Sequence, residues 1–289
     1  DMVDLAHFRT FARPFIGDVP TVLYFHETQL TYPTSGGGSD VSYSMTNWLS
    51  ALAADRVLFN SGYHQDVFFE HLPELLSQPP DHTHVHLVDT VRAKSEVLPV
   101  GVDLSWVVET DRLGRTPRVL WNHRWEFDKD PDRFAEAVVE LSQSGVDFEL
   151  VLVGYRPTRP PEALERIRAV AADRIVHDGE APVDLYRKLV ASCHIVVSTA
   201  VQEFFGISVV EAIAAGSRPV LPHRLSYQWL IPDQFHDLVL YPDGGFTEAL
   251  ATAIDHPSLP PGLAESMHRF SWTTMAPEYD RRLAEIADR

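Results

Sequence analysis

The chain has 289 residues, long enough for two domains, and its 45% hydrophobic and 22% charged residues are typical of a globular protein. Acidic residues outnumber basic ones by 41 to 24, a formal net charge of -17 at pH 7, which argues against a protein that coats nucleic acid through a general basic surface. No apolar run approaches the roughly 18 residues of a membrane span and no signal-peptide pattern opens the chain. We therefore expect a cytoplasmic protein with no membrane partner.

The first domain is predicted to span residues 1–106. It opens at Asp1 in a helical pattern, whereas a strand usually begins a nucleotide-binding sheet, so we expect that an N-terminal piece lies outside this numbering. Apolar segments predict strands, and periodic segments predict helices, in this order: strands 21–25, 56–59 and 96–99, and helices 44–53 and 62–72. This alternation favours a parallel α/β sheet. The glycine-rich residues 34–39 are typical of a mobile loop.

The second domain is predicted to span residues 118–289, after a charged linker at 107–117. Its predicted strands are residues 118–121, 148–153, 174–176, 195–198, 218–221 and 238–240, and its helices are 132–143, 161–172, 183–191, 207–215 and 247–255. This order favours a doubly wound sheet with its ligand beyond the carboxyl ends of the strands. A last helix, 272–287, with Ser271 as its N-cap, is assigned to this domain, and a crossing back to the first is the alternative. Cys193 lies in an apolar run and is expected to be buried and unreactive.

Two carboxylates eight positions apart, Glu203 and Glu211, flank Gly206 between a predicted strand and a predicted helix. If the helix begins near Gly206, Glu203 lies in the loop at the end of the strand and Glu211 projects from the second turn. Gly206 would let a phosphate approach the helix N-terminus. Glu211 could accept hydrogen bonds from ribose hydroxyls, and Glu203 from those of a sugar. The alternative is a surface helix with two solvated glutamates.

A pair of cations, Arg124 and Lys129, follows the first predicted strand of the same domain. A planar guanidinium and a compact ammonium could together stabilise a diphosphate leaving group, as a divalent metal does elsewhere. We interpret Asp128 and Asp130 as carboxylates at a helix N-terminus and expect no metal. A salt bridge between the cations and these aspartates is the alternative.

His26 and Glu27 follow the first predicted strand of the chain. His26 could bind a sugar hydroxyl or assist an acceptor, and a purely structural histidine is the equal alternative. Glu27 and His123 are further candidates for contacts with acceptor or sugar.

Two other polar clusters are interpreted as solvated. The first cluster is three alternating histidines, His82, His84 and His86, which would point the same way if their segment were extended. No cysteine or carboxylate is spaced to complete a metal site with them. The second cluster could form a local basic patch, but a solvated face is favoured; it consists of Arg156, Arg159, Arg166 and Arg168.

The paired cations followed by the two-glutamate element resemble the retaining GT-B glycosyltransferases, such as sucrose and trehalose-phosphate synthases. A more specific resemblance, to the tRNA-queuosine mannosyltransferase branch, rests on four strings: Tyr-Phe-His-Glu at 24–27, His-Arg-Trp-Glu at 123–126, Glu-Phe-Phe-Gly at 203–206 and Phe-Ser-Trp at 270–272. The resemblance implies two Rossmann-like domains facing each other across a cleft, the first incomplete at its start.

The same resemblance implies a donor, an acceptor and a mechanism. The donor is GDP-mannose, the acceptor is queuosine in tRNA, and no cofactor or metal takes part. Arg124, Lys129 and Gly206 would bind the diphosphate, Glu211 the ribose and Glu203 the transferred sugar. His26 would line the acceptor side. Transfer would proceed with retention through a front-face, ion-pair-like displacement without a protein nucleophile, in which the leaving phosphate helps to deprotonate the acceptor.

The sequence departs from the family pattern at one place, and two other functions are alternatives to the predicted one. Gln228 and Trp229 stand where relatives usually have a Pro-Glu pair, which bears on a polar contact near the donor. A nucleotide-sugar epimerase of the same architecture and a nucleotide-sugar-binding module without catalysis are the alternatives. Product analysis separates the three functions.

Overall fold

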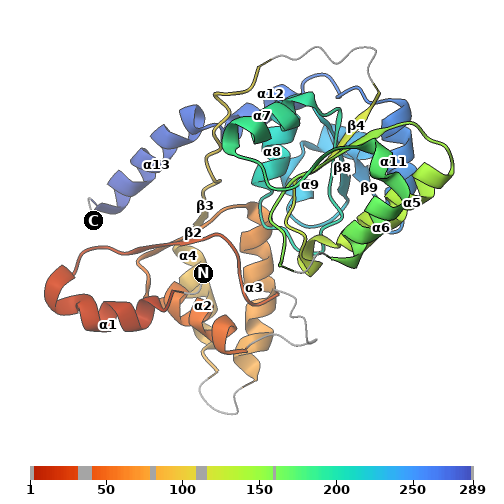
Figure 1. Cartoon of the computed structure of the whole chain (residues 1–289). Helices are drawn as coiled ribbons and strands as arrows, with labels where there is room; N and C mark the ends of the chain where they lie inside the picture. Colours follow the sequence, from red (N-terminus) through yellow and green to blue (C-terminus); the bar gives the residue numbers. More distant parts are fainter. Residues whose placement is uncertain (1–2, 32–40, 79–82, 109–115, 159–160, 288–289) are drawn as a thin grey trace. The chain divides into compact units, whose positions relative to one another are not determined.

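The computed structural model describes residues 3–31, 41–78, 83–108, 116–158 and 161–287. The chain divides into two compact units: Asp1–Val100 with Met275–Arg289 form unit 1, and Gly101–Thr274 form unit 2 (Figure 1). Each unit has its own parallel sheet and its own hydrophobic core. The predicted glycine-rich loop, most of the predicted linker, His82 and Arg159 lie outside the described residues.

Unit 1 contains a three-stranded parallel sheet in the order β1-β2-β3. Its strands are β1 Val22–Phe25, β2 Arg56–Phe59 and β3 Ser95–Val97. Its helices are α1 Leu5–Ile16, α2 Val41–Ala53, α3 Gly62–Ser77 and α4 Val88–Ala93, with a 3-10 turn at Val85–Leu87. The three predicted strands are confirmed to within two residues, because apolar runs of this length are buried on both faces of a parallel sheet.

The core of unit 1 is aromatic. Phe25 of β1 and Phe59 of β2 stack with their ring centroids 5.3 Å apart, and Phe68 of α3 lies 5.3 Å from each of them. Trp48 of α2 is fully buried in the same cluster. These rings attach α2 and α3 to the sheet, and they fix the carboxyl ends of β1 and β2.

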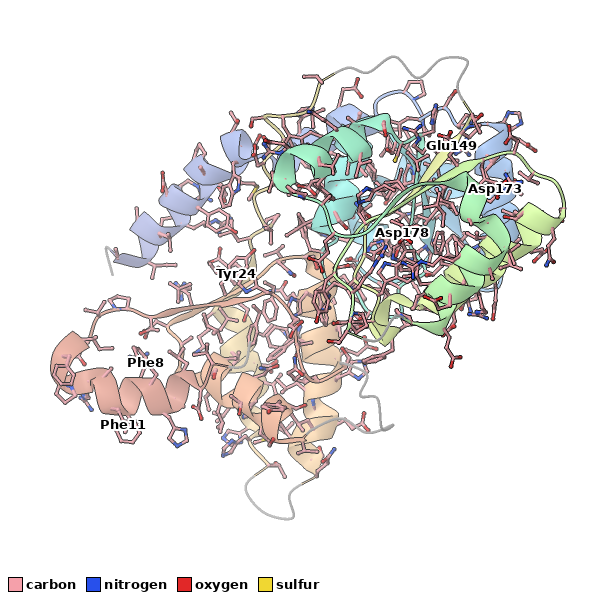
Figure 2. All side chains as sticks on the ribbon, in the orientation of Figure 1. Phe8, Phe11, Tyr24, Glu149, Asp173 and Asp178 are labelled. Carbon is pink, nitrogen blue, oxygen red and sulfur yellow. The ribbon has the colours of Figure 1, made fainter. Side chains whose placement is uncertain are left out.

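α1 presents apolar side chains to solvent. Phe8 and Phe11 project from this helix and are 54% and 76% exposed (Figure 2). The helix is attached instead through Leu5, whose amide donates to the Ser50 hydroxyl at 3.0 Å, and through Arg9, which donates to the carbonyl of Ala53 at 2.6 Å. The side chain of Leu5 is also buried in the core of unit 1, and Arg9 pairs with Asp55 at 2.9 Å, so the first half of the helix holds it in place.

His84 and His86, the described members of the alternating histidines, do not lie in an extended segment. His84 has a left-handed backbone with φ 54°, and the following residues form the 3-10 turn Val85–Leu87. The Nδ1 atom of His84 accepts from the indole of Trp48 at 3.4 Å. In the part of the chain that the structure describes, no three or more His, Cys, Asp or Glu side chains are grouped to hold a metal ion.

Unit 2 contains a six-stranded parallel sheet in the order β6-β5-β4-β7-β8-β9. Its strands are β4 Arg118–Trp121, β5 Glu149–Leu152, β6 Ile175–Asp178, β7 Ile195–Val197, β8 Arg218–Pro222 and β9 Leu240–Tyr241. Its helices are α5 Pro131–Gln143, α6 Glu162–Ala171, α7 Val183–Ser192, α8 Ile207–Ala214, α9 Tyr227–Leu230, α10 His236–Val239, α11 Phe246–Asp255 and α12 Leu263–Met267. The sheet is doubly wound, as predicted, and the strand order reverses between β4 and β7, where open α/β sheets bind their ligands.

Three details of unit 2 differ from the prediction or complete it. The strand expected at 238–240 is only Leu240–Tyr241, because the helical turns that follow Pro232 continue through Val239. The short helices α9 and α12 were not predicted. Cys193 is buried, as predicted, and its thiol lies 3.1 Å from the carbonyl of Leu189.

The last helix, α13 Trp272–Ala287, is divided between the units. Ser271 is its N-cap, as predicted, and accepts from the amide of Thr274 at 3.3 Å. Assignment of the whole helix to the second domain does not match the structure, because Met275 packs with Leu58 and Leu98 of unit 1. The Tyr279 hydroxyl also donates to the carbonyl of Pro99 at 3.1 Å.

The boundary between the units lies at residue 100 rather than in the predicted linker 107–117. Val102 already forms a parallel bridge with Ser271, and its amide donates to the carbonyl of Phe270 at 2.7 Å. Gly101 lies directly against the ring of Trp272. Among the described helices, none is both long enough and apolar enough to cross a bilayer.

Replacing Gly154 by alanine tests how closely β5 must approach the loop after β4. Gly154 has φ +122°, and a Cβ there would overlap the carbonyl of His123. Backbone strain and overpacking together should lower the free energy of unfolding by about 3 kcal/mol or more, measured by urea denaturation. Gly244→Ala is the control, since Gly244 has φ +80° but open space around it. An equal loss in both variants would contradict the close approach.

Candidate functional site

The loop after β4 turns Lys129 into the protein. A 3-10 turn, Phe127–Lys129, ends at Asp130, which has the left-handed backbone φ 48°, ψ 61° and caps α5 by accepting from the amide of Arg133 at 3.2 Å. Pro131 then begins the helix with its φ already suited to it. Lys129 is only 8% exposed as a result.

The loop after β7 carries the two glutamates in the predicted places. α8 begins at Ile207, directly after Gly206, so that Glu203 lies in the loop and Glu211 in the second helical turn. Gly206 has φ +96°, and a Cβ there would meet no atom closer than 3.5 Å. The left-handed backbone, rather than a shortage of space, therefore favours glycine at this position.

Hydrogen bonds join these two loops into one structure. The Thr199 hydroxyl donates to the carbonyls of Lys129 and Asp130, both at 2.8 Å. The Val201 amide donates to the carbonyl of Asp128 at 2.9 Å. The ammonium of Lys129 donates in turn to the carbonyl of Gln202 at 2.8 Å. The candidate cations and the first glutamate are thus held together at the switch point of the sheet.

Lys129 lies between two carboxylates. Its Nζ atom is 3.2 Å from Oδ2 of Asp128 and 3.2 Å from Oε2 of Glu203. Burial lowers the pKa of Lys129, but the two carboxylates outweigh it and hold that pKa above its ordinary value. Burial likewise raises the pKa of Glu203, and Lys129 with His123 outweighs it, so the net shift is downward. Lys129 and Glu203 therefore both carry their charges at neutral pH.

Arg124 lies at the exposed edge of the cluster. Its side chain is 48% exposed and pairs with Glu126 at 2.7 Å and with Asp128 at 3.4 Å. The salt bridges that the sequence offered as an alternative are therefore present at both cations. An exposed guanidinium can exchange a carboxylate for a phosphate, whereas Lys129 is fixed by its burial.

His123 links the ends of two neighbouring strands. It is 4% exposed, and its Nε2 atom donates to the carbonyl of Val197 at 3.1 Å. Burial and the nearby charge of Lys129 lower the pKa of His123 to about 4. The ring is therefore neutral at pH 7, and its Nδ1 atom can only accept a hydrogen bond.

Glu211 belongs to a second group of contacts, which the sequence did not predict. The Tyr186 hydroxyl donates to Oε2 of Glu211 at 2.8 Å, and the Asn122 amide donates to the carbonyl of Ser208 at 2.9 Å. Burial raises the pKa of Glu211, and Tyr186 opposes that shift. Tyr186 lies 25 positions before Glu211, and no local pattern in its helix marks it as a partner of the glutamate.

His26 and Glu27 lie in unit 1, at the carboxyl end of β1. The ring of His26 is 4.9 Å from that of Tyr24, and its carbonyl accepts from the Asn60 side chain at 2.7 Å. Burial lowers the pKa of His26. Glu27 accepts from the Gln29 side-chain amide at 3.0 Å.

The segment in which the chain departs from its relatives is aromatic. Gln228 is exposed. The ring of Trp229 lies 6.1 Å from Phe205 and 5.7 Å from Phe270. Phe205 lies two residues after Glu203 in the same loop. The apolar contact of Trp229 with Phe205 therefore supports that loop.

The described arginines of the suggested basic patch are paired with carboxylates. Arg156 and Arg168 both donate to Asp178 (Figure 2), and Arg166 donates to Asp132. This part of the surface is therefore close to neutral and does not form an anion-binding patch.

Comparison with known proteins finds two family models and a similar relative. Residues 1–102 match the family model described as tRNA-queuosine alpha-mannosyltransferase N-terminal, and residues 116–256 match that of glycosyl transferases group 1. The tRNA-queuosine alpha-mannosyltransferase of Drosophila melanogaster is 31% identical over 233 residues, 77% of this chain. The chain spans 62% of the length of that relative.

Solved structures share the fold at low identity. Sucrose-phosphate synthase from Thermosynechococcus elongatus superimposes with a TM-score of 0.69 at 17% identity, over 92% of this chain and 67% of the other. Anabaena HepE in complex with UDP-glucose gives 0.70 at 18% identity, over 97% and 75%. The fold is that of the GT-B glycosyltransferases, as predicted. The N-terminal family model and the Drosophila relative also confirm the resemblance to the tRNA-queuosine mannosyltransferases.

Replacing Lys129 by methionine tests the buried ion cluster. The change leaves Glu203 buried without a cation and Asp128 paired with Arg124 alone, which should lower the free energy of unfolding by about 3–5 kcal/mol at pH 7 in urea denaturation. The native pair stabilises above the unfolded pKa of Glu203 and loses this contribution as the pH falls, whereas the variant is relieved when Glu203 takes up a proton. The difference between the two proteins should therefore shrink on acidification.

The double variant Lys129→Met, Glu203→Gln is the control. It removes the carboxylate that is left without a cation and should regain part of the lost stability. Equal stability of Lys129→Met and the native protein at pH 7 would contradict a buried ion cluster.

Proposed function

We propose that this chain belongs to a metal-independent, retaining glycosyltransferase that transfers mannose from GDP-mannose to queuosine in tRNA. One observation carries the proposal: the ammonium of Lys129 and the carboxylate of Glu203, from the loops after β4 and β7, meet 3.2 Å apart at the switch point of a doubly wound sheet. A diphosphate needs the cation and a sugar needs the carboxylate, and the two are adjacent.

The donor would bind along these two loops. Arg124 and Lys129 would bind the diphosphate, and the exposed start of α8 after Gly206 adds amide donors for a phosphate oxygen. Glu203 would accept from a sugar hydroxyl, and Glu211, two helical turns along, from the ribose. His123 is neutral and offers Nδ1 as an acceptor to the same sugar.

The transfer step needs no protein nucleophile. The bond between the anomeric carbon and the diphosphate oxygen breaks, and its electron pair leaves with the diphosphate, whose charge Arg124 and Lys129 stabilise. The acceptor oxygen forms its bond on the same face of the sugar, and its proton passes to the leaving phosphate. His26 and Glu27 would contact the acceptor. Two fixed cations replace the divalent metal that otherwise neutralises such a leaving group.

Support for the acceptor comes from the first unit. Residues 1–102 match a model named for tRNA-queuosine mannosyltransferases, and the Drosophila relative has the same name. A tRNA acceptor would place the reaction in the cytoplasm. Anabaena HepE, one of the structural neighbours, was solved in complex with UDP and with UDP-glucose. The base of the donor nucleotide is therefore the part of the proposal to test first.

Calorimetric titration of GDP, UDP and ADP in the presence of EDTA tests the donor site. We expect GDP to bind selectively, and Arg124→Ala to weaken that binding about 10- to 100-fold through the loss of a charged hydrogen bond. Arg118→Ala is the matched control, because Arg118 lies at the other end of β4, where it pairs with Glu149 at 2.6 Å. It should leave the affinity for GDP unchanged.

Each outcome of the titration has a clear meaning. Selective UDP binding would overturn the GDP assignment and keep the site. Equal losses in Arg124→Ala and Arg118→Ala would remove Arg124 from the site. Failure of every nucleotide to bind the folded protein would overturn the donor site as a whole.

Product analysis then tests the reaction. Incubation with GDP-[14C]mannose and tRNA should transfer label to tRNA that contains queuosine and leave queuosine-free tRNA unlabelled. Release of an epimerised sugar would indicate an epimerase. Binding of GDP-mannose without transfer to either tRNA would contradict the proposed acceptor.

A further inference from the structure

Three side chains link β4, α7 and α8 through hydrogen bonds. The Asn122 amide donates to the Ser208 carbonyl in the first turn of α8 at 2.9 Å and to the Tyr186 hydroxyl at 3.4 Å. The Tyr186 hydroxyl donates to Oε2 of Glu211 at 2.8 Å, in the next turn of the same helix. The orientation of the phenol is therefore set from both sides, by an amide that donates to it and by a carboxylate that accepts from it.

Glu211 differs from Glu203 in having no cation within ion-pair distance among the described side chains. The nearest cation that acts on its charge, Arg187 of α7, pairs instead with Asp103 at 2.7 Å. Asp103 itself disfavours the charged form of Glu211, and Glu265 of the adjacent α12 is exposed. The donor that contacts this half-buried carboxylate is thus a neutral hydroxyl.

A neutral donor suits a carboxylate that must bind neutral groups. Tyr186 occupies one oxygen, Oε2, and none of the described residues donates to Oε1. A cation in the place of Tyr186 would draw the carboxylate toward itself and reduce its strength as an acceptor, as Lys129 does for Glu203. The phenol fixes the direction of the carboxylate and leaves its charge available.

We propose that Tyr186 is a positioning residue that aims the free oxygen of Glu211 at the ribose hydroxyls of the donor nucleotide, and so makes the site select ribose over deoxyribose. This inference rests on the proposed function, since it takes Glu211 as the ribose contact. Asn122 assists by fixing the phenol against the start of α8.

The test compares GDP with 2′-deoxy-GDP by calorimetry. The native protein should prefer GDP by about 10-fold or more, the effect of one hydrogen bond to a charged acceptor. Tyr186→Phe keeps the ring and removes the hydroxyl, and should reduce this preference to about 2-fold, with GDP binding weakened about 5- to 10-fold. Tyr241→Phe is the matched control. It removes another buried hydroxyl of unit 2, which donates to the Ser198 carbonyl at 2.8 Å, and should keep the preference.

The pH dependence of GDP binding gives a second readout that a merely structural role would not change. Binding needs ionised Glu211, so it should fall as the pH falls through the raised pKa of this group. Loss of the Tyr186 donor raises that pKa further, so the pH of half-maximal binding should move upward in Tyr186→Phe. Protonation of GDP and of His123, whose pKa is about 4, is common to both proteins and cancels in the comparison.

The outcomes separate this inference from the function on which it rests. If the native protein binds no GDP, the proposed donor site fails. If GDP binds and Arg124→Ala weakens it, while Tyr186→Phe keeps both the preference for ribose and the pH midpoint, the positioning role is overturned and the donor site stands. Loss of the preference in Tyr241→Phe as well would show a general effect of lost packing and would also overturn it.

Discussion

The site of unit 2 depends on one buried ammonium. Lys129 lies 3.2 Å from each of two carboxylates, one from its own loop and one from the loop after β7. A buried charge is tolerated only when its partners offset the loss of hydration, so removing Lys129 or moving the two loops apart would leave Glu203 uncompensated. The backbone contacts of Thr199 and Val201 with the loop of Lys129 follow the same constraint. The two loops at the switch point therefore behave as one rigid structure.

The two cations of the site, Lys129 and Arg124, differ in burial and therefore in how they can bind a diphosphate. Lys129 is 8% exposed and already paired with two carboxylates. Arg124 is half exposed, and its ion pair with Glu126 is in contact with solvent. An incoming diphosphate can displace Glu126 from Arg124 with little loss of free energy, because exposed ion pairs are weak. Displacing Glu203 from Lys129 requires the sugar to replace the ammonium as its partner. An intact nucleotide sugar should therefore bind more tightly than the free nucleotide.

The sequence predicted the features of the site that are local in the chain. The helix that begins after Gly206 and the positions of Glu203 and Glu211 all follow from one strand-loop-helix pattern, whereas the left-handed backbone of Gly206 was not predicted. Tyr186 could not be predicted, because its contact with Glu211 arises only when α7 packs beside α8. The assignment of α13 failed for a related reason, since an amphipathic helix does not indicate which of two cores it will cover. Periodicity identifies elements, and tertiary packing chooses their partners.

The negative net charge of the chain affects the binding of its two proposed substrates, the donor diphosphate and the tRNA, to different degrees. A single diphosphate can be held at short range by two cations, and a net charge of -17 acts on it only weakly once it is inside the site. A tRNA presents many phosphates, yet several cations of unit 1 already have internal partners: Arg9 with Asp55, Arg56 with Glu96, and Arg282 with Glu96. Neutralisation of phosphates is what makes nucleic-acid binding depend on salt. These three arginines are therefore less available to tRNA phosphates, and contacts with the modified base would carry more of the recognition of a tRNA.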